Sequence, residues 1–323
     1  MLEYQEDIIN NEAQHIENFC AGFESIIDQY LNKGTQVEIG GCESYTTAVM
    51  RANDLNWDAT KGLEGFLGDG IKKIYEMIKN FFKGIWNFFF GSSKVVSDAK
   101  KNADDIETIL KDSNFKRSLN ESLANASLSM DLAMQKARRN GTNLDQLEAD
   151  LKKDREASKM IDNAVGRIGA VFSYKIETEH ANAGKYRDEL DKFGNTMLEL
   201  LGTSYSYSAY RKLSEGFSEI SLATIRTNYS TTRAEGIVAL VAAAKVALVN
   251  SESALKELER TVEGIRHKAE KEKTRDTEYK AQQALRLVNL AMRRTAHILT
   301  VLAKNIKIIN EQTEIIKKVG VFA

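Results

Sequence analysis

The chain has 323 residues, and its 45 lysines and arginines balance 46 aspartates and glutamates, for a formal net charge of −1. This balance excludes a general electrostatic attraction to nucleic acid, and we expect no specific nucleic-acid recognition. Proline is absent, whereas average usage would give about sixteen. Because proline breaks helix interiors, its absence predicts an all-α fold, a bundle of long helices.

The sequence predicts two regions. Residues 1–95 form an N-terminal helical region with an aromatic amphipathic helix, and residues 96–323 form a long-helix bundle with a C-terminal coiled-coil segment. The only two cysteines, Cys20 and Cys42, favour reduced thiols over a disulfide scaffold in a chain of this size. The first residues lack the basic start and apolar core of a signal peptide, so we expect synthesis in the cytoplasm without one.

The first predicted helix covers residues 3–32, where an apolar stripe that includes Phe19 recurs at helical spacing. Residues 35–42 alternate weakly between polar and apolar and contain two glycines, so this stretch is either a short hairpin or a loop. It is the one place where we expect a strand. A second, short helix is expected from Ser44 to Leu55.

The stretch from Gly62 to Gly91 is the most distinctive part of the sequence. One face of a helix collects the apolar side chains Ile71, Ile74, Ile78, Phe82, Ile85 and Phe89, and the opposite face carries Lys72, Lys79 and Lys83. The apolar face is widened by Phe81, Trp86, Phe88 and Phe90. We expect Asp69 to cap the first turn and Gly91 to end the helix in the left-handed conformation.

This amphipathic helix has two interpretations, and both stay open. A core helix of a helical domain has the same pattern. A helix that binds a membrane or a partner protein is favoured by the glycines at 62, 65, 68 and 70, which provide a hinge. Because lysines along one side are costly in lipid, such a helix would lie in the bilayer interface rather than span it.

The next segments are polar and rich in small residues. An apolar stripe from Ile106 to Met134 predicts a helix that ends at Asn140, another helix follows up to Phe172, and a further one covers residues 184–201. The segment from Ile237 to Val249 is almost continuously apolar, but it is too short to span a bilayer and contains Lys245. We expect a buried helix there, with a second membrane-inserting arm as the alternative.

The C-terminal segment contains a coiled-coil seam, because apolar side chains alternate steps of three and four over more than four heptads. The seam consists of Leu285, Val288, Met292, Leu299, Leu302, Ile306, Ile309 and Ile316. Either it joins helices of the same chain or it joins subunits. Upstream, the pattern loses its register, which predicts a stutter or a break near Lys273.

Signatures of catalysis are missing. The sequence has no phosphate-binding glycine loop and no cysteine pair at metal-ligand spacing, and no two of the histidines lie one helical turn apart. Each histidine, among them His15 and His297, is therefore interpreted as a surface or packing residue. We expect no enzymatic activity, no cofactor and no metal site.

The glycine-hinged helix ends in Trp86-Asn87-Phe88-Phe89-Phe90-Gly91 and joins proline-free helices rich in Asn, Lys and Ser. Over about residues 57–95 this arrangement resembles internal head and other structural proteins of large tailed bacteriophages. The resemblance implies a non-enzymatic virion component that is made in the host cytoplasm and assembles as a homo-oligomer or with other virion proteins. The alternative is an α-helical pore-forming protein, similar only in architecture, which would release residues 62–91 into membranes.

Overall fold

The computed structural model describes residues 14–25, 41–52, 69–91, 94–124, 173–179, 188–196, 225–271 and 277–321, with a few single positions between them. Most of these residues are helical, and the only sheet among them has two short strands. The predicted all-α bundle of long helices is therefore confirmed.

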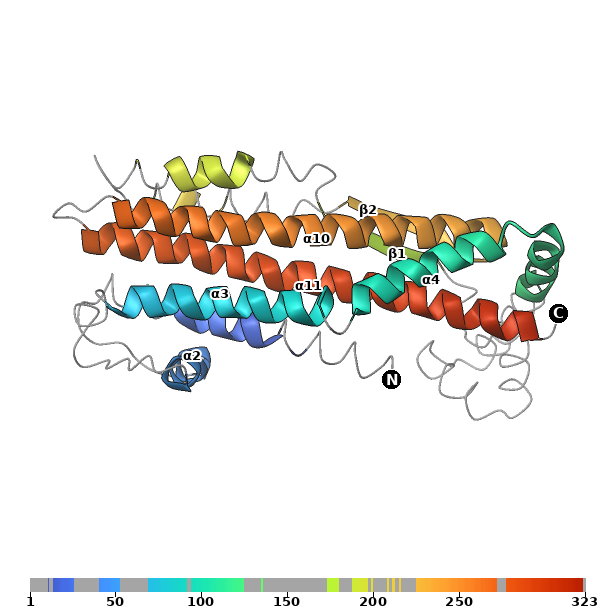
Figure 1. The fold of residues 1–323 in the computed structure, drawn as a ribbon, viewed down its shortest axis with the longest axis horizontal. Coiled ribbons are helices and arrows are strands. Elements are labelled where there is room, and N and C mark those ends of the chain that lie inside the picture. The colour runs from blue at the N-terminus through green and yellow to red at the C-terminus, as the bar shows by residue number, and fades with distance from the viewer. Residues whose placement is uncertain are drawn as a thin grey trace.

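Two long helices form the axis of the molecule. Helix α10 (Ala234–Lys271) has 38 residues and helix α11 (Thr277–Val321) has 45, which correspond to about 57 and 67 Å. They run antiparallel, side by side, over most of their length (Figure 1). The chain reverses between them, so the register lost near Lys273 marks a break between two helices rather than a stutter within one.

Helix α11 is buried on almost every side. All eight residues of the predicted seam, from Leu285 to Ile316, are buried. Other turns of the helix bury further apolar side chains, including Leu287, Ile298 and Ile315. The seam therefore packs within one chain, and α11 is a central helix rather than a surface offered to another subunit.

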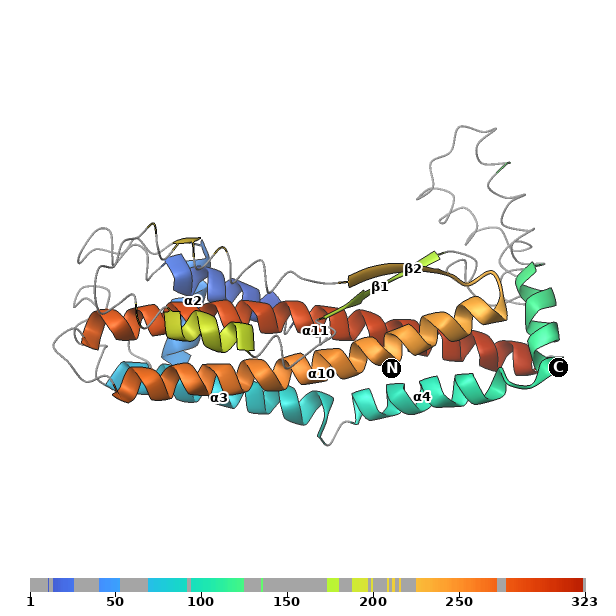
Figure 2. The same ribbon diagram turned by 90° about the horizontal axis from the view of Figure 1, so that it is seen from above.

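Helices α3 (Asp69–Phe89) and α4 (Val95–Ile109) lie end to end along α10 (Figure 2). Lys100 of α4 forms an ion pair with Glu252 of α10 at 2.9 Å, and Lys245 pairs with Asp104 one turn further along. The predicted start of α3 at Asp69 agrees with the structure. Gly91 does not adopt the predicted left-handed conformation, which Lys94 takes instead with a φ of 52°.

Gly91 is required for a different reason. A Cβ atom at this position would lie 2.6 Å from the carbonyl oxygen of Asn87, so any larger residue would collide with the last turn of α3. The helix predicted up to Asn140 is interrupted after α4. The Asp112 carboxylate accepts hydrogen bonds from the backbone N–H groups of Asn114 and Phe115, which caps the helical residues 113–124. The helix predicted up to Phe172 lies outside the described residues.

Two shorter helical segments complete the bundle near α3. Residues 14–25 are helical, and α2 covers Gly41–Ala52, so the second helix begins three residues before the predicted Ser44. Of the stretch 35–42, where a hairpin or loop was predicted, only Gly41 and Cys42 are described, and they begin α2. The hydroxyl group of Thr46 donates to the carbonyl oxygen of Phe19 at 2.9 Å, which ties α2 to helical segment 14–25.

The sheet lies where the sequence analysis expected no strand. Strand β1 (Ser173–Thr178) pairs antiparallel with β2 (Ile225–Ser230), with Ser173 opposite Ser230 and Thr178 opposite Ile225. The pair lies against α10 and α11 (Figure 2). Ile176 is buried and belongs to the same hydrophobic core as the helices. The restriction of strands to residues 35–42 was therefore wrong.

A single hydrophobic core joins these elements. It includes side chains from helical segment 14–25, α2, α3, α4, α10 and α11, so it contains residues from both sides of the predicted boundary at residue 95. Whether residues 1–95 and 96–323 behave as separate units stays a prediction.

Candidate functional site

Helix α3 carries most of the residues that the sequence singled out, and it is docked on the bundle by one face. The side chains of Ile78, Phe82 and Phe89 expose only 1, 5 and 1% of their surface. Lys79 and Lys83 are exposed on the opposite face. The two faces predicted from the three- and four-residue spacing are therefore present in the folded chain.

Trp86 and Phe90 occupy the edge of the docked face. Both are half-buried, and their rings stack with centroids 4.4 Å apart. The ammonium group of Lys256 on α10 lies 4.8 Å from the centroid of the Trp86 ring, a cation–π distance. The Trp86–Phe90 pair therefore lies at the edge of the contact between α3 and α10, where it is partly exposed to solvent.

Six further predicted residues belong to helix α3, and the surroundings of their side chains lie outside the described part of the structure: Ile71, Lys72, Ile74, Phe81, Ile85 and Phe88. Of the predicted glycine hinge, Gly62, Gly65 and Gly68 also lie outside the described residues, whereas Gly70 belongs to the first turn of α3.

Among the described side chains of α3, three large apolar ones dock the helix on the bundle. Their burial contributes about 5 to 9 kcal/mol before the conformational entropy of ordering the helix is subtracted. Among the described residues, no ion pair joins α3 to the bundle, in contrast to α4. A surface that buried the same side chains elsewhere would therefore compete directly with the docked position.

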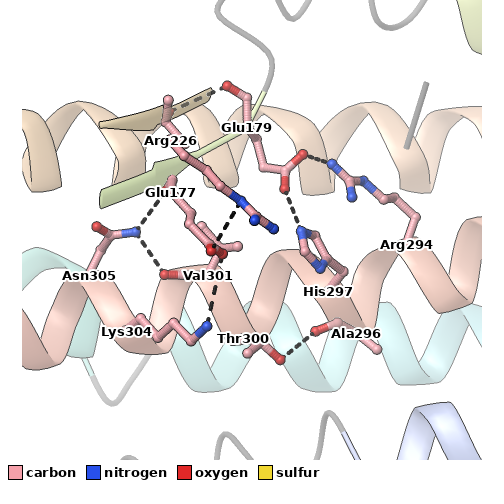
Figure 3. Close-up of polar contacts among 11 residues, drawn as sticks. Glu177, Glu179, Arg226, Arg294, Ala296, His297, Thr300, Val301, Lys304 and Asn305 are labelled. Atoms are coloured by element: carbon pink, nitrogen blue, oxygen red, sulfur yellow. Dashed lines mark hydrogen bonds and ion pairs between the residues drawn. The ribbon is translucent and has the colours of Figure 1, made fainter. Parts of the chain in front are cut away.

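A second site lies where β1 meets α11 and is built from charged side chains. Glu179 directly follows β1, and its carboxylate points at the guanidinium of Arg294 and at the imidazole of His297 (Figure 3). The side chains of Glu179 and Arg294 are each 1% exposed. The distance from Glu179 Oε1 to His297 Nε2 is 3.3 Å.

Burial governs the protonation of this charged cluster. It lowers the pKa of Arg294 to about 9, which leaves the guanidinium charged at neutral pH. Burial, reinforced by the charge of Arg294, lowers the pKa of His297 to about 4. Although the carboxylates of Glu177 and Glu17 favour a charged imidazole, burial and the charge of Arg294 outweigh them, and His297 is neutral near pH 7. The cluster is thus one buried ion pair with a neutral imidazole beside it.

Polar contacts on both sides of the cluster fix β1 to α11. The carboxylate of Glu177 lies 3.5 Å from Arg226 of β2 and 3.9 Å from Lys304 of α11. The amide of Asn305 donates to the backbone carbonyl of Glu177 at 3.2 Å (Figure 3). Further towards the N-terminus of α11, the amide of Asn289 donates to the carbonyl oxygen of Cys20 at 3.0 Å.

Sequence reasoning did not select these polar residues. A usable signal was present in α11, because Arg294 and Asn305 interrupt an otherwise apolar face of the helix. Their partners could not be inferred, since Glu177 and Glu179 lie more than a hundred residues away. His297, interpreted as a surface or packing residue, is the partly exposed member of the cluster. Within the described part of the chain, no three potential metal-ligating side chains lie together.

Helix α10 has one further property. Of the described helices, it alone is long and apolar enough to cross a membrane, over Ala234–Lys268, by length and composition. A buried core helix of a soluble protein meets the same criteria. In the folded chain this segment is partly buried, but Val246 and Val249 remain exposed on one side.

Comparison of the chain with protein-family models, with curated proteins and with solved structures gave no match. The chemistry of α3, of the charged cluster and of α10 therefore has to be argued from the residues themselves.

Proposed function

We propose that this chain is a non-enzymatic structural protein that assembles with other protein subunits, as a component of a bacteriophage particle, with α3 as its interaction element. The observation that carries the proposal is the position of α3. Its apolar face packs inward, Lys79 and Lys83 face outward, and the Trp86–Phe90 pair borders the surface. The seam of α11 is buried within the chain, so subunit contacts must use other surfaces.

Both faces of α3 suit a protein partner. Aromatic side chains are enriched at protein interfaces because they bury a large area at low entropic cost. The exposed lysines would favour an acidic partner surface. A partner can bind the outer face while α3 stays docked, or it can take over the apolar face after α3 leaves.

Sedimentation velocity of the purified chain without lipid tests this proposal. We expect a concentration-dependent oligomer that the variant Lys79→Glu/Lys83→Glu weakens at least tenfold. The matched control, Lys101→Glu/Lys111→Glu, reverses two exposed charges outside α3 and should leave the oligomer unchanged. A chain that stays monomeric at all concentrations and does not respond to lipid would contradict the proposal.

The second candidate function, an α-helical pore-forming protein, is favoured by α10. This helix contains the membrane-length apolar segment. Its charges at Lys245 and Glu252 are paired with α4 in the folded chain. Release of α3 and α4 would expose the side of the apolar segment that faces them, and membrane insertion would also require α10 to separate from α11.

Vesicle experiments distinguish the two functions. In a Trp57→Phe background, a blue shift of Trp86 emission on anionic vesicles, together with dye release, would favour a pore. No shift and no leakage, with a stable oligomer in buffer, would favour the structural role. Movement of α3 can be followed with spin labels at Gly84→Cys and Gly264→Cys, because a Cβ atom at either position has no neighbouring atom within 4 Å outside its own stretch of helix.

The labelling needs one further change. Cys42 is exposed and has to be replaced by serine. Cys20 is buried, and burial raises the pKa of its thiol far above the ordinary value, so it should not react with the label. A label distance that stays constant on vesicles and in the oligomer would mean that α3 acts from its docked position.

A further inference from the structure

A small cavity lies beneath α3, where four helical segments meet. Its volume is about 210 Å³. Helical segment 14–25, α2, α3 and α11 all contribute to its wall. The cavity is thus formed by the tertiary packing of the bundle and is not a feature of one helix surface.

The floor and the rim of the cavity differ in polarity. The floor consists of buried apolar side chains, Ile16, Phe19, Ile78 and Met292. The rim is more exposed and includes Val49 and Met77 together with the polar residues His15 and Asn80. The hydroxyl group of Tyr45 is hydrogen-bonded to Nδ1 of His15. The other ring nitrogen of His15, Nε2, is therefore the one that a ligand could use.

This lining specifies the chemistry of a ligand. An apolar cavity of about 150 Å³ in another protein binds benzene, so 210 Å³ is enough for a molecule of one or two fused rings. Met77 and Met292 are adaptable, and their sulfur atoms make favourable contacts with aromatic rings. A single hydrogen-bonding group on the ligand could reach His15 or Asn80 at the rim, while the ring lies on the floor.

We propose that the cavity is a binding site for a small aromatic molecule of one or two rings with one hydrogen-bonding group. Binding itself does not depend on the proposed function. One consequence does depend on the proposed function. The ligand would touch α3 and three other segments at once, so its binding stabilises α3 in the docked position by mass action.

Indole is the probe for the test, because it has two fused rings and one N–H donor. Isothermal titration of the full chain should give saturable binding of one indole per chain. Val49→Phe would fill the cavity from its rim and should weaken the binding at least tenfold. The matched control Val246→Phe makes the same substitution at an exposed position of α10 and should bind indole as the unmodified chain does.

If Val49→Phe fails to fold, Met77→Trp fills the cavity from α3 and takes its place. Equal binding of indole by the filled and unfilled chains would overturn the proposal, as would the lack of saturable binding up to millimolar concentrations. The effect on α3 has a separate readout. If indole binds but does not alter the response of the Gly84–Gly264 label pair to vesicles or to assembly, the site stands and its link to the proposed function fails.

Discussion

Helices α3 and α11 are both amphipathic by sequence, yet they are held in the fold in opposite ways. Helix α11 is buried around almost its whole circumference, and buried polar side chains fix it to β1 and to helical segment 14–25. The described side chains of helix α3 are buried on one face, by apolar contacts, with Lys79 and Lys83 in solvent on the other.

This difference separates a fixed axis from a detachable element. Apolar packing is non-directional, so another apolar surface can replace, at little cost in free energy, the surface of the bundle on which α3 packs. The charged contacts of α11 are directional and desolvated, and they cannot be exchanged without leaving a charge unpaired. We therefore expect disruption of α11 to unfold the whole chain and disruption of α3 to act locally.

The largest effect is expected from Arg294→Met. The substitution leaves the buried carboxylate of Glu179 without its guanidinium, which should lower the free energy of unfolding by about 3 to 5 kcal/mol. Urea unfolding followed by circular dichroism measures it. Arg211→Met is the control, because it removes an ion pair with Glu215 in which the two side chains are 71% and 59% exposed, and it should cost less than about 1 kcal/mol.

A double variant sharpens this prediction. Glu179→Leu/Arg294→Met replaces both charges with apolar side chains and should recover much of the stability that the single substitution loses. If the free energy of unfolding of Arg294→Met lies within about 1 kcal/mol of that of the unmodified chain, the cluster does not fix β1 to α11.

Phe82→Ala tests the other side of the comparison. Removing a buried phenylalanine ring costs about 3 to 5 kcal/mol where the surrounding structure cannot relax. Here we expect α3 to detach instead, with a red shift of Trp86 emission in the Trp57→Phe background and faster proteolysis near Gly91. The urea midpoint of the α10–α11 pair should change little.

Lys83→Ala, on the exposed face of α3, is the matched control and should leave emission and proteolysis unchanged. Should Phe82→Ala lower the midpoint of the whole chain as much as Arg294→Met does, α3 is part of the fixed core and not a detachable element.

The features that the sequence predicted are those set by local periodicity. The spacing of Ile78, Phe82 and Phe89 identified the docked face of α3, and the heptads from Leu285 to Ile316 identified the packing of α11. Both patterns repeat within a few residues, so they can be read without knowledge of the partner.

The features that were missed depend on pairing across the chain. Strands β1 and β2 contain alternating β-branched and aromatic residues, such as Tyr174 and Ile176 or Thr227 and Tyr229, but each is short and its partner is distant. The ion pair of Glu179 with Arg294 was missed for the same reason. A local pattern also could not decide whether the α11 seam was internal, because both arrangements require the same apolar spacing.

Acid should weaken the attachment of β1 to α11. His297 has a pKa of about 4 in the folded chain and about 6.5 when unfolded. Between these values the unfolded chain binds the additional proton, so stability falls as the pH is lowered from about 6.5 to about 4 and this contribution is constant below. Because the imidazole is partly exposed, we expect a loss of about 1 to 2 kcal/mol.

The charged groups that face His297 come from three elements: Arg294 and Lys304 of α11, Glu177 and Glu179 at β1, and Glu17 of helical segment 14–25. Urea unfolding at pH 7 and pH 4.5 measures the loss. His297→Gln removes the titrating group, so the difference between the two chains isolates its contribution from that of the carboxylates. An equal loss in both chains would assign the acid sensitivity to other groups.

The smallest effect is expected from Gly84→Ala, which stabilises the helical conformation of α3 without changing the face that packs on the bundle. Gly84 is exposed within the helix, and a Cβ atom there would meet no other atom within 4 Å. Alanine should therefore stabilise α3 by about 0.5 to 1 kcal/mol through helix propensity alone, measured as slower amide hydrogen exchange in α3 with unchanged exchange in α11. Gly91→Ala is the opposing variant, because its Cβ would lie 2.6 Å from the carbonyl oxygen of Asn87, and it should speed exchange in the last turn of α3. Slower exchange in α11 as well as in α3 for Gly84→Ala would show that the two helices open together, and the distinction between a fixed axis and a detachable element would fail.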